Sequence, residues 1–255
     1  MKTSFKTNRF GLTRGALTFA NRLLVCLWFF QVLGRQPVFG QSEATLRIYL
    51  ARHGETDWNV ERRLQGGTDI PLNAKGRQQA EKLGDHLKGI ALDAVYSSTL
   101  KRSRDTAQMV RAQAALKSLP GLSERRLGKF EGARLDDRDS VITAEYKRRA
   151  KDPDDALDGG ESWNQFFARV RGALEAIQAQ HPSGAILIIG HQATNQMILR
   201  ALLGLTLDQA LSIYQNNGEV YLIEVNREGQ TRLLKLISQL NLGEPLDWMR
   251  LADGR

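Results

Sequence analysis

Short apolar runs alternate with longer amphipathic segments along most of this 255-residue chain. Residues 46–51, 92–97 and 185–189 have the length and composition of buried strands. Residues 73–88 and 100–116 instead carry apolar side chains at the helical period. Strands that alternate with helices of about ten or more residues predict parallel βαβ units. We therefore expect an α/β fold, a three-layer α/β/α sandwich around a mostly parallel central sheet.

The rest of the chain completes this pattern. We expect helices over 142–150 and 193–203, and a helix that begins at Ser162 with a capping box closed by Gln165. Residues 120–138 have the composition of a loop. Two further strands are predicted, over the ranges 220–225 and 233–237.

Polar side chains follow three of the predicted strands. Arg52 and His53 follow the first strand, Ser98 and Arg102 the second, and His191 the third. Ligands of parallel sheets lie beyond the carboxyl ends of the strands, so we expect these groups to gather at one edge. Arginine binds oxyanions with a planar fork, and an unprotonated histidine can attack phosphorus. The pattern predicts chemistry on a phosphate group.

The segment Leu50 to Asn59 reads Leu-Ala-Arg-His-Gly-Glu-Thr-Asp-Trp-Asn. It resembles the Leu-x-Arg-His-Gly-Glu-Thr-x-x-Asn signature of the histidine phosphatase superfamily, also called the phosphoglycerate mutase-like family. The resemblance implies a phosphoglycerate mutase-like fold. It also implies that His53 is the nucleophile and that Arg52 binds phosphate.

Two downstream segments carry the resemblance further. Residues 97–107 resemble the family's Ser-Ser-x-Leu-x-Arg-Ala-x-x-Thr-Ala motif, with Ser103 in place of the usual alanine, so Arg102 is expected to bind phosphate. His191 resembles the family's second histidine. Most members have glycine next, whereas this chain has Gln192, which is closer to the fructose-2,6-bisphosphatase branch. We expect both His191 and Gln192 to contact substrate.

Residues 122–132 resemble the family's Leu-x-Glu-x-x-x-Gly-x-x-Glu-Gly motif, whose first glutamate donates a proton. This implies that Glu124 is the donor. Glu131 is the alternative, and we expect it to order the loop instead. Asn59, Gln65 and Gly66 resemble secondary phosphate contacts, and ordinary turn chemistry explains each of them equally well.

The implied mechanism is a two-step phosphoryl transfer. Neutral His53 attacks phosphorus in line, while Arg52, Arg102 and a protonated His191 hold the oxygen atoms and their charge. Glu124 protonates the leaving alcohol and then takes a proton from water. A phosphohistidine links the two steps. We expect no cofactor and no metal ion, because these cations supply the electrostatic stabilisation.

Residues 1–45 differ from the rest of the chain, since they carry +5 of its formal net charge of +8. A basic stretch reaches Arg22, and an uncharged run follows over 23–34. That run suits a signal-peptide core and is short for a bilayer span. We expect a signal peptide or membrane anchor plus linker over 1–45, and a phosphatase domain over 46–255. The protein would then be periplasmic, secreted or membrane-anchored. The alternative is a cytoplasmic enzyme with a misplaced start.

Charge and cysteine content limit the partners. Residues 46–255 carry only +3 and have no basic helix with interleaved aromatic residues, so we expect no nucleic-acid partner. Any membrane association is expected through residues 1–45 only. Cys26 is the only cysteine, so the predicted catalytic domain has no disulfide and no thiol nucleophile. The sequence does not indicate an oligomeric state.

We therefore expect an acid-type, metal-independent histidine phosphatase that hydrolyses a small phosphorylated metabolite. The alternatives are a cofactor-dependent phosphoglycerate mutase, a fructose-2,6-bisphosphatase-like sugar phosphatase, or an inactive relative that only binds. A mutase must exclude water, which needs a substantial covering segment. Glu124 and His191 are only 67 positions apart, and two predicted helices occupy much of that interval. This spacing favours hydrolysis.

Overall fold

The computed structural model describes residues 45–110, 112–136 and 140–237. The predicted signal peptide or anchor falls on residues outside this described part. Within the described ranges, none of the helices combines the length and the apolar character needed to cross a membrane.

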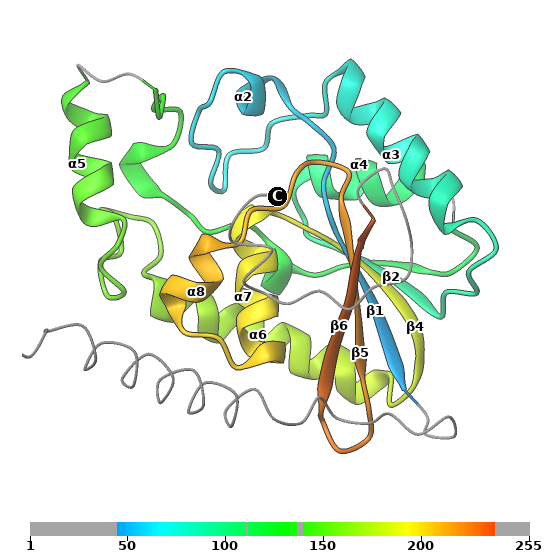
Figure 1. Cartoon of the computed structure of the whole chain (residues 1–255). Helices are drawn as coiled ribbons and strands as arrows, with labels where there is room; N and C mark the ends of the chain where they lie inside the picture. Colours follow the sequence, from blue (N-terminus) through cyan, green and yellow to red (C-terminus); the bar gives the residue numbers. More distant parts are fainter. Residues whose placement is uncertain (1–44, 111, 137–139, 238–255) are drawn as a thin grey trace, which may run out of the picture. The chain divides into compact units, whose positions relative to one another are not determined.

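A six-stranded sheet in the order β3-β2-β4-β1-β5-β6 forms the centre of the described residues (Figure 1). Its strands are β1 (Leu46–Arg52), β2 (Ala94–Ser97), β3 (Leu116–Ser118), β4 (Gly184–Gly190), β5 (Val220–Val225) and β6 (Thr231–Ile237). The pairs β1–β4, β2–β4 and β2–β3 are parallel, whereas β5 is antiparallel to both β1 and β6. The mostly parallel sheet is confirmed.

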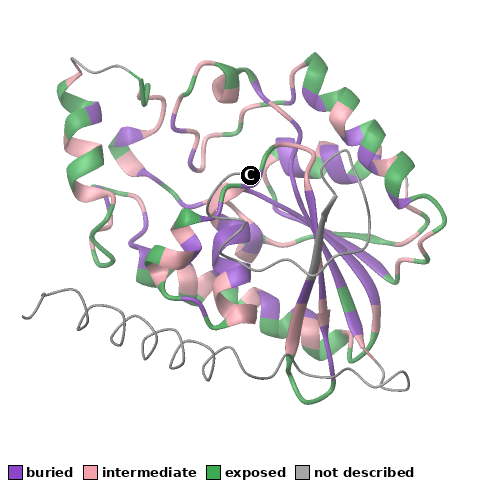
Figure 2. Ribbon diagram, in the orientation of Figure 1, coloured by how far each residue is buried: buried purple, intermediate pink, exposed green. Residues whose placement is uncertain are grey.

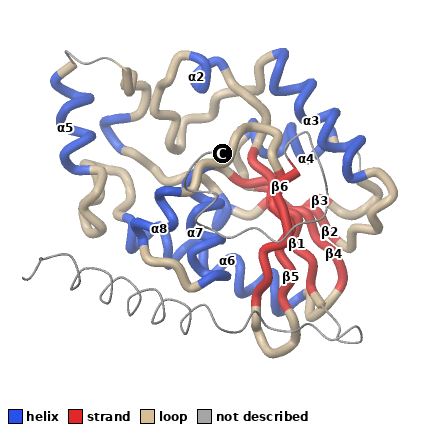
Figure 3. The backbone as a smooth tube through the Cα atoms, in the orientation of Figure 1, coloured by secondary structure: helices blue, strands red, loops and turns tan. Residues whose placement is uncertain are grey.

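Helices cover both faces of this sheet. One face packs against α3 (Ala74–Leu87) and α4 (Lys101–Met109). The other packs against α6 (Trp163–Gln180), α7 (Gln192–Leu203) and α8 (Leu207–Ser212). Figure 3 shows the strands between the two groups of helices, and Figure 2 shows that the central strands are mostly buried. The sandwich of three layers follows from strands such as β4, whose apolar residues face a core on each side.

Local capping explains where several helices begin. Asn73 accepts the Gly76 N–H and begins α3, as predicted. The predicted capping box of Ser162 and Gln165 begins α6. Thr56 and Asn59 form a further capping box on the single-turn helix α2 (Asp57–Val60), which the sequence pattern did not predict. These caps satisfy backbone N–H groups that the first turn of a helix leaves unpaired.

The predicted helix over 100–116 is wrong in its second half, because α4 ends at Met109 and residues 116–118 form strand β3. The alanine-rich segment has helical propensity. The edge of β2, however, offers backbone hydrogen bonds from Val95 N–H to Ala115 O at 3.1 Å and from Leu119 N–H to Ser97 O at 2.9 Å. Tertiary pairing thus overrides local propensity. The short helix α8 was also not predicted.

The described residues between β3 and α6 form a small lobe beside the carboxyl end of the sheet. It contains two 3₁₀ turns (Pro120–Leu122 and Gly128–Phe130) and α5 (Val141–Arg149). α5 lies apart from the sheet in Figure 3. A separate apolar cluster packs the lobe against the segment after α2 and consists of Leu64, Leu127, Phe130 and Leu157.

Candidate active site

The structure brings four of the predicted site residues together where β1, β2 and β4 end. Arg52, His53, Arg102 and His191 are each at most 7% exposed. Arg52 and His53 come from the end of β1. Arg102 lies in the first turn of α4, and His191 lies between β4 and α7. Arg52, His53, Arg102 and Glu124 line a pocket of about 750 Å³. The expected gathering of polar groups at one edge of the sheet is therefore observed.

His53 is held in a single tautomer. Its Nδ1 lies 2.7 Å from the Gly54 carbonyl oxygen. A carbonyl only accepts, so Nδ1 carries the proton and Nε2 keeps its lone pair. Burial lowers the pKa of His53 well below its ordinary value, and the nearby Arg102 and Arg52 lower it further. His53 is thus neutral at neutral pH, and its Nε2 lone pair is available to react.

His191 is neutral as well, which corrects the expectation of a protonated ring. Arg102 Nε donates to His191 Nδ1 at 3.2 Å, and a guanidinium cannot accept, so Nδ1 has no proton. His191 Nε2–H then donates to Ser98 Oγ at 2.7 Å. Burial lowers the pKa of His191 well below its ordinary value, followed by repulsion from Arg102. The centroids of the His53 and His191 rings are 5.0 Å apart.

Three hydrogen bonds fix Arg102 in place, but they do not use all of its N–H groups. Its Nη1 donates to Thr68 O at 2.7 Å and its Nη2 to Gly66 O at 2.9 Å, in addition to the bond to His191. A guanidinium has five N–H groups, so two remain for a ligand. Burial lowers the pKa of Arg102 to about 10, so it is cationic at neutral pH.

Arg52 also retains donor capacity. Its Nη1 donates to Gln215 O at 2.7 Å and to Gln192 Oε1 at 3.4 Å. Its Nε is buried and has no partner among the described residues. Such an orphaned donor fits an oxyanion that completes its hydrogen bonding.

Gln192 lines the pocket, but the oxygen and the nitrogen of its side chain both form hydrogen bonds within the protein. Besides the contact with Arg52, its Oε1 accepts the Gln215 N–H at 3.1 Å, and its Nε2 donates to Ile213 O at 2.8 Å. Gln215 in turn donates to Leu50 O at 3.0 Å. These two glutamines place Arg52, and Gln215 had no sequence signal that would distinguish it from a loop residue.

Glu124 lies against the first turn of α7. Its carboxylate accepts the Ala193 N–H at 3.1 Å and the Thr194 N–H at 3.2 Å. The α7 N-cap residue, His191, makes no side-chain cap of its own. Glu124 therefore supplies the missing cap from a distant loop and lies in the pocket at the same time.

Arg169 of α6 holds the loop that carries Glu124. Its Nη1 donates to the carbonyl oxygens of Gly121 and Ser123, each at 3.0 Å. Its Nε and Nη2 form a bidentate pair with the buried Glu161, at 2.8 Å each. The sequence analysis missed Arg169, because an arginine on an amphipathic helix does not differ locally from a solvated one.

The remaining predicted residues have mixed placements. Asn59 lines the pocket, but its Oδ1 accepts from Thr56 in the α2 cap. Gln65 lines the pocket with Oε1 buried and unpaired among the described residues. Gly66 has a φ of 51°, and its carbonyl accepts from Arg102. Glu131 accepts from Gly67 N–H at 2.8 Å, so it orders the loop, as expected.

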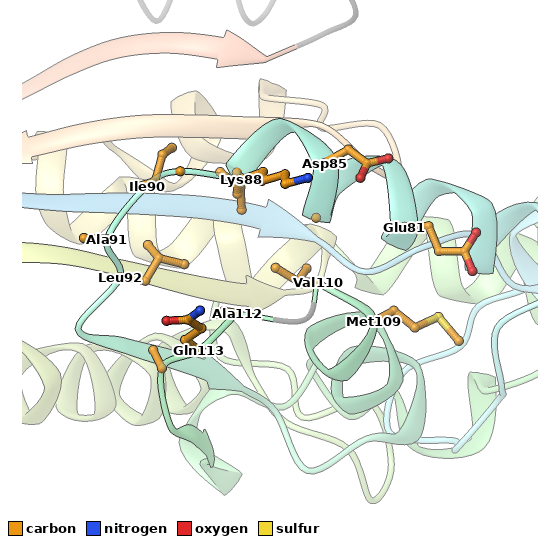
Figure 4. A pocket seen from close by; sticks show the side chains of 14 residues that line it. Glu81, Asp85, Lys88, Ile90, Ala91, Leu92, Met109, Val110, Ala112 and Gln113 are labelled. Carbon is orange, nitrogen blue, oxygen red and sulfur yellow. The ribbon is translucent and has the colours of Figure 1, made fainter.

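A second hollow, of about 950 Å³, lies between the C-terminal ends of α3 and α4 (Figure 4). The residues that line this hollow come just before β2 and β3 in the chain. The hollow therefore lies at the end of the sheet opposite to His53. The described lining residues include neither histidine nor arginine. Within the described part of the chain, no three His, Cys, Asp or Glu side chains are grouped so that they could hold a metal ion.

Comparisons with known proteins agree with this geometry. The family description "Histidine phosphatase superfamily (branch 1)" matches residues 48–237. The chain is 30% identical over 205 residues to phosphoserine phosphatase 1 of Hydrogenobacter thermophilus, covering 78% of this chain and 95% of that protein. It is 33% identical over 159 residues to the uncharacterized phosphatase PhoE of Bacillus subtilis, covering 62% and 77%.

Solved structures show the same fold. The alpha-ribazole phosphatase of Shigella flexneri superposes with a TM-score of 0.69 at 27% identity, covering 78% of this chain and 99% of that chain. A phosphoserine phosphatase of Entamoeba histolytica, in complex with 3-phosphoglyceric acid, gives a TM-score of 0.66 at 26% identity, covering 76% and 97%.

Proposed function

The chain belongs to the histidine phosphatase superfamily and is a phosphatase, and from that premise we propose that it hydrolyses a small phosphorylated metabolite through a phosphohistidine on His53. The observation that carries this proposal is the state of His53. Its Nδ1–H is bound to Gly54 O, its pKa is lowered by burial, and its Nε2 is unprotonated in a pocket lined by arginines.

In the first step, Nε2 of His53 forms a bond to phosphorus while the bond from phosphorus to the leaving oxygen breaks. The spare N–H groups of Arg102 and the unpaired Nε of Arg52 bind the equatorial oxygens, where charge is concentrated in the transition state. These donors are held in place before substrate arrives, which is the condition for strong electrostatic stabilisation. The proposal assigns no step to a metal ion.

Glu124 serves as the proton donor to the leaving alcohol. In the second step it takes a proton from water, whose oxygen attacks phosphorus and releases His53 and inorganic phosphate. The loop that Arg169 holds keeps this carboxyl in the pocket. Neutral His191 orients Arg102 through Nδ1, and Ser98 fixes the His191 tautomer.

Phosphate release from an aryl phosphate tests the proposal. We expect turnover that survives EDTA and is inhibited by vanadate, which mimics five-coordinate phosphorus. If EDTA abolishes turnover and added magnesium or zinc restores it, metal independence is contradicted. A parallel assay follows interconversion of 2- and 3-phosphoglycerate primed with bisphosphoglycerate. Fast interconversion with negligible phosphate release would show that the acceptor is a second substrate alcohol instead of water.

A further inference from the structure

We propose that Thr194 is a positioning residue for proton transfer, and that its hydroxyl stabilises the carboxylate that forms on Glu124 as the leaving alcohol departs. The proposal rests on the phosphatase function argued above, in which Glu124 donates that proton. It adds a second residue to this step and gives the two oxygen atoms of the Glu124 carboxyl group different tasks.

The Thr194 hydroxyl lies between two acceptors. Thr194 is fully buried in the first turn of α7. Its Oγ1 lies 3.3 Å from Glu124 Oε1 and also 3.3 Å from Ser123 O. A hydroxyl has one hydrogen to donate, so it favours one of these acceptors at a time. Rotation of the hydroxyl moves the hydrogen between them and displaces no heavier atom.

The hydrogen bonds to Glu124 are unevenly divided between its two oxygen atoms. Oε1 accepts the N–H groups of Arg125 at 3.0 Å and of Thr194 at 3.2 Å, in addition to the Thr194 hydroxyl. From the described residues, Oε2 accepts only the Ala193 N–H, at 3.1 Å. Each carboxyl oxygen has about two lone pairs, so Oε1 is fully used while Oε2 keeps one free. The proton for the leaving alcohol is therefore carried on Oε2, and Oε1 is the anchored oxygen.

The charge on Glu124 changes during the first chemical step. The Oε2–H bond breaks, and the proton moves to the leaving oxygen, which takes the electron pair of the breaking bond to phosphorus. Glu124 thereby becomes a carboxylate while Nε2 of His53 bonds to phosphorus. Before the transfer, the Thr194 hydroxyl can donate to Ser123 O. As negative charge develops on the carboxyl group, it gains more by donating to Oε1.

This difference between the two states is what accelerates the reaction. A hydrogen bond to a charged acceptor is about twice as strong as one to a neutral acceptor. Only an interaction that is stronger in the transition state than before it raises the rate of the chemical step. Because Thr194 is fully buried, water does not compete for its hydroxyl. Arg169 also fixes the alternative acceptor, since it donates to Ser123 O at 3.0 Å.

The variant Thr194→Val tests the proposal, because valine has nearly the same shape and lacks the hydroxyl. We expect kcat/KM for an alkyl phosphate to fall about fivefold to twentyfold, the range of a hydrogen bond to a charged group. An aryl phosphate should lose much less, because its leaving group needs no proton. Thr194→Ser keeps the hydroxyl and should recover most of the activity on the alkyl phosphate.

Thr143→Val is the matched control. Thr143 is also buried, and its hydroxyl donates to Arg134 O at 2.7 Å instead of to Glu124. This variant should change kcat/KM for alkyl and aryl phosphates by the same factor. Circular dichroism and the thermal midpoint report whether each variant folds, and Thr194→Ala gives the same comparison if Thr194→Val does not.

A double-mutant cycle shows whether Thr194 acts through Glu124. In a Glu124→Gln background, no carboxylate forms, so Thr194→Val should cause little further loss on the alkyl phosphate. A further loss as large as in the unmodified enzyme would contradict the proposal.

Equal losses on alkyl and aryl phosphates in a folded Thr194→Val or Thr194→Ala variant would overturn the proposal, since Thr194 would then have a structural role only. Thr194→Ser that is no more active on the alkyl phosphate than Thr194→Val would overturn it too. A wrong choice of proton donor has a different signature, because Glu124→Gln would itself lack the leaving-group dependence. If the phosphatase function itself is wrong, the unmodified enzyme releases no phosphate from the aryl phosphate.

Discussion

His53 and His191 lie side by side, yet a different ring nitrogen carries the proton in each. The Gly54 carbonyl fixes the proton of His53 on Nδ1, whereas Arg102 and Ser98 fix that of His191 on Nε2. The lone pair of His53 therefore belongs to Nε2, the atom proposed to attack phosphorus. His191 orients Arg102 together with the carbonyl oxygens of Thr68 and Gly66.

Glu124 caps α7 and is the proposed proton donor, and one substitution can separate these two roles. Glu124→Gln keeps an oxygen that can accept from α7 but cannot donate a proton as a carboxylic acid does. We expect kcat/KM for an alkyl phosphate to fall by about 10² to 10⁴. An aryl phosphate should lose much less, because its leaving group needs no proton. Steady-state kinetics on both substrates measure the difference.

Glu131→Gln is the control for that experiment, since Glu131 accepts hydrogen bonds from Gly67 and Leu127 and orders the loop. It should affect alkyl and aryl phosphates to the same extent. If Glu131→Gln shows the leaving-group dependence and Glu124→Gln does not, the proton donor is Glu131.

At the scale of elements, the Arg149 side chain links α5 to the loop that follows it. Arg149 donates to Asp155 at 2.7 Å through both Nε and Nη2, and to Glu145 at 3.0 Å and Asp158 at 2.8 Å through Nη1. The Arg149 hydrogen bonds lower the pKa of Asp155 to about 2, with a further contribution from the Leu157 N–H. This ion-pair support is complete above the ordinary aspartate pKa and is lost as the pH falls toward 2.

Arg149→Met should loosen α5 and the loop after it. Because Tyr146 of α5 lines the pocket, we expect KM to rise several-fold with a smaller change in kcat. Amide hydrogen exchange over 141–158 should accelerate. Arg148→Met is the matched control, since Arg148 is exposed on the same helix. Equal exchange rates in the two variants would contradict this role of Arg149.

Elements with strong local signals were predictable from the sequence. The α3 cap at Asn73 and the capping box at Ser162 were predicted because they depend on neighbours within a few residues. Strand β3 was not, because only the edge of β2 makes residues 116–118 extended. Helix α8 is too short for its periodicity to be recognised.

The same distinction holds within the site. Arg52, His53, Arg102 and His191 could be predicted because each follows a strand end or matches a motif. Arg169 and Gln215 could not, because their roles consist of hydrogen bonds to residues distant in the chain, such as Ser123 and Leu50. The protonation state of His191 depends on burial and on Arg102, which only the folded structure shows.

At the scale of the whole molecule, two buried neutral histidines couple stability to pH. Burial lowers the pKa values of His53 and His191 in the folded protein. In the unfolded chain both pKa values are about 6.5. Above that pH, neither state binds protons on these rings. Below it, the unfolded chain binds protons first, so the free energy of unfolding falls as the pH falls.

We expect urea unfolding at pH 7.5, 6.5 and 5.5 to show this loss, with a limiting slope of about 1.4 kcal/mol per pH unit for each histidine. His53→Gln should reduce the slope by about half. Carboxylates contribute little in this range, because their unfolded pKa values lie near about 4. A midpoint that stays constant or rises on acidification from pH 7.5 to 5.5 would show that the two rings are not held neutral.

The central claim is that phosphorus becomes bonded to Nε2 of His53. Rapid quenching of the enzyme with a ³²P-labelled phosphomonoester, followed by peptide mapping, tests it most directly. The predicted result is a phosphoenzyme that is stable in base, labile in acid and located on the peptide containing His53, as expected of a phosphoramidate. His53→Ala should form none and turn over at far less than about a tenth of the unmodified rate. An acid-stable phosphoenzyme on a serine, or a folded His53→Ala variant that retains about a tenth of the activity or more, would contradict the claim.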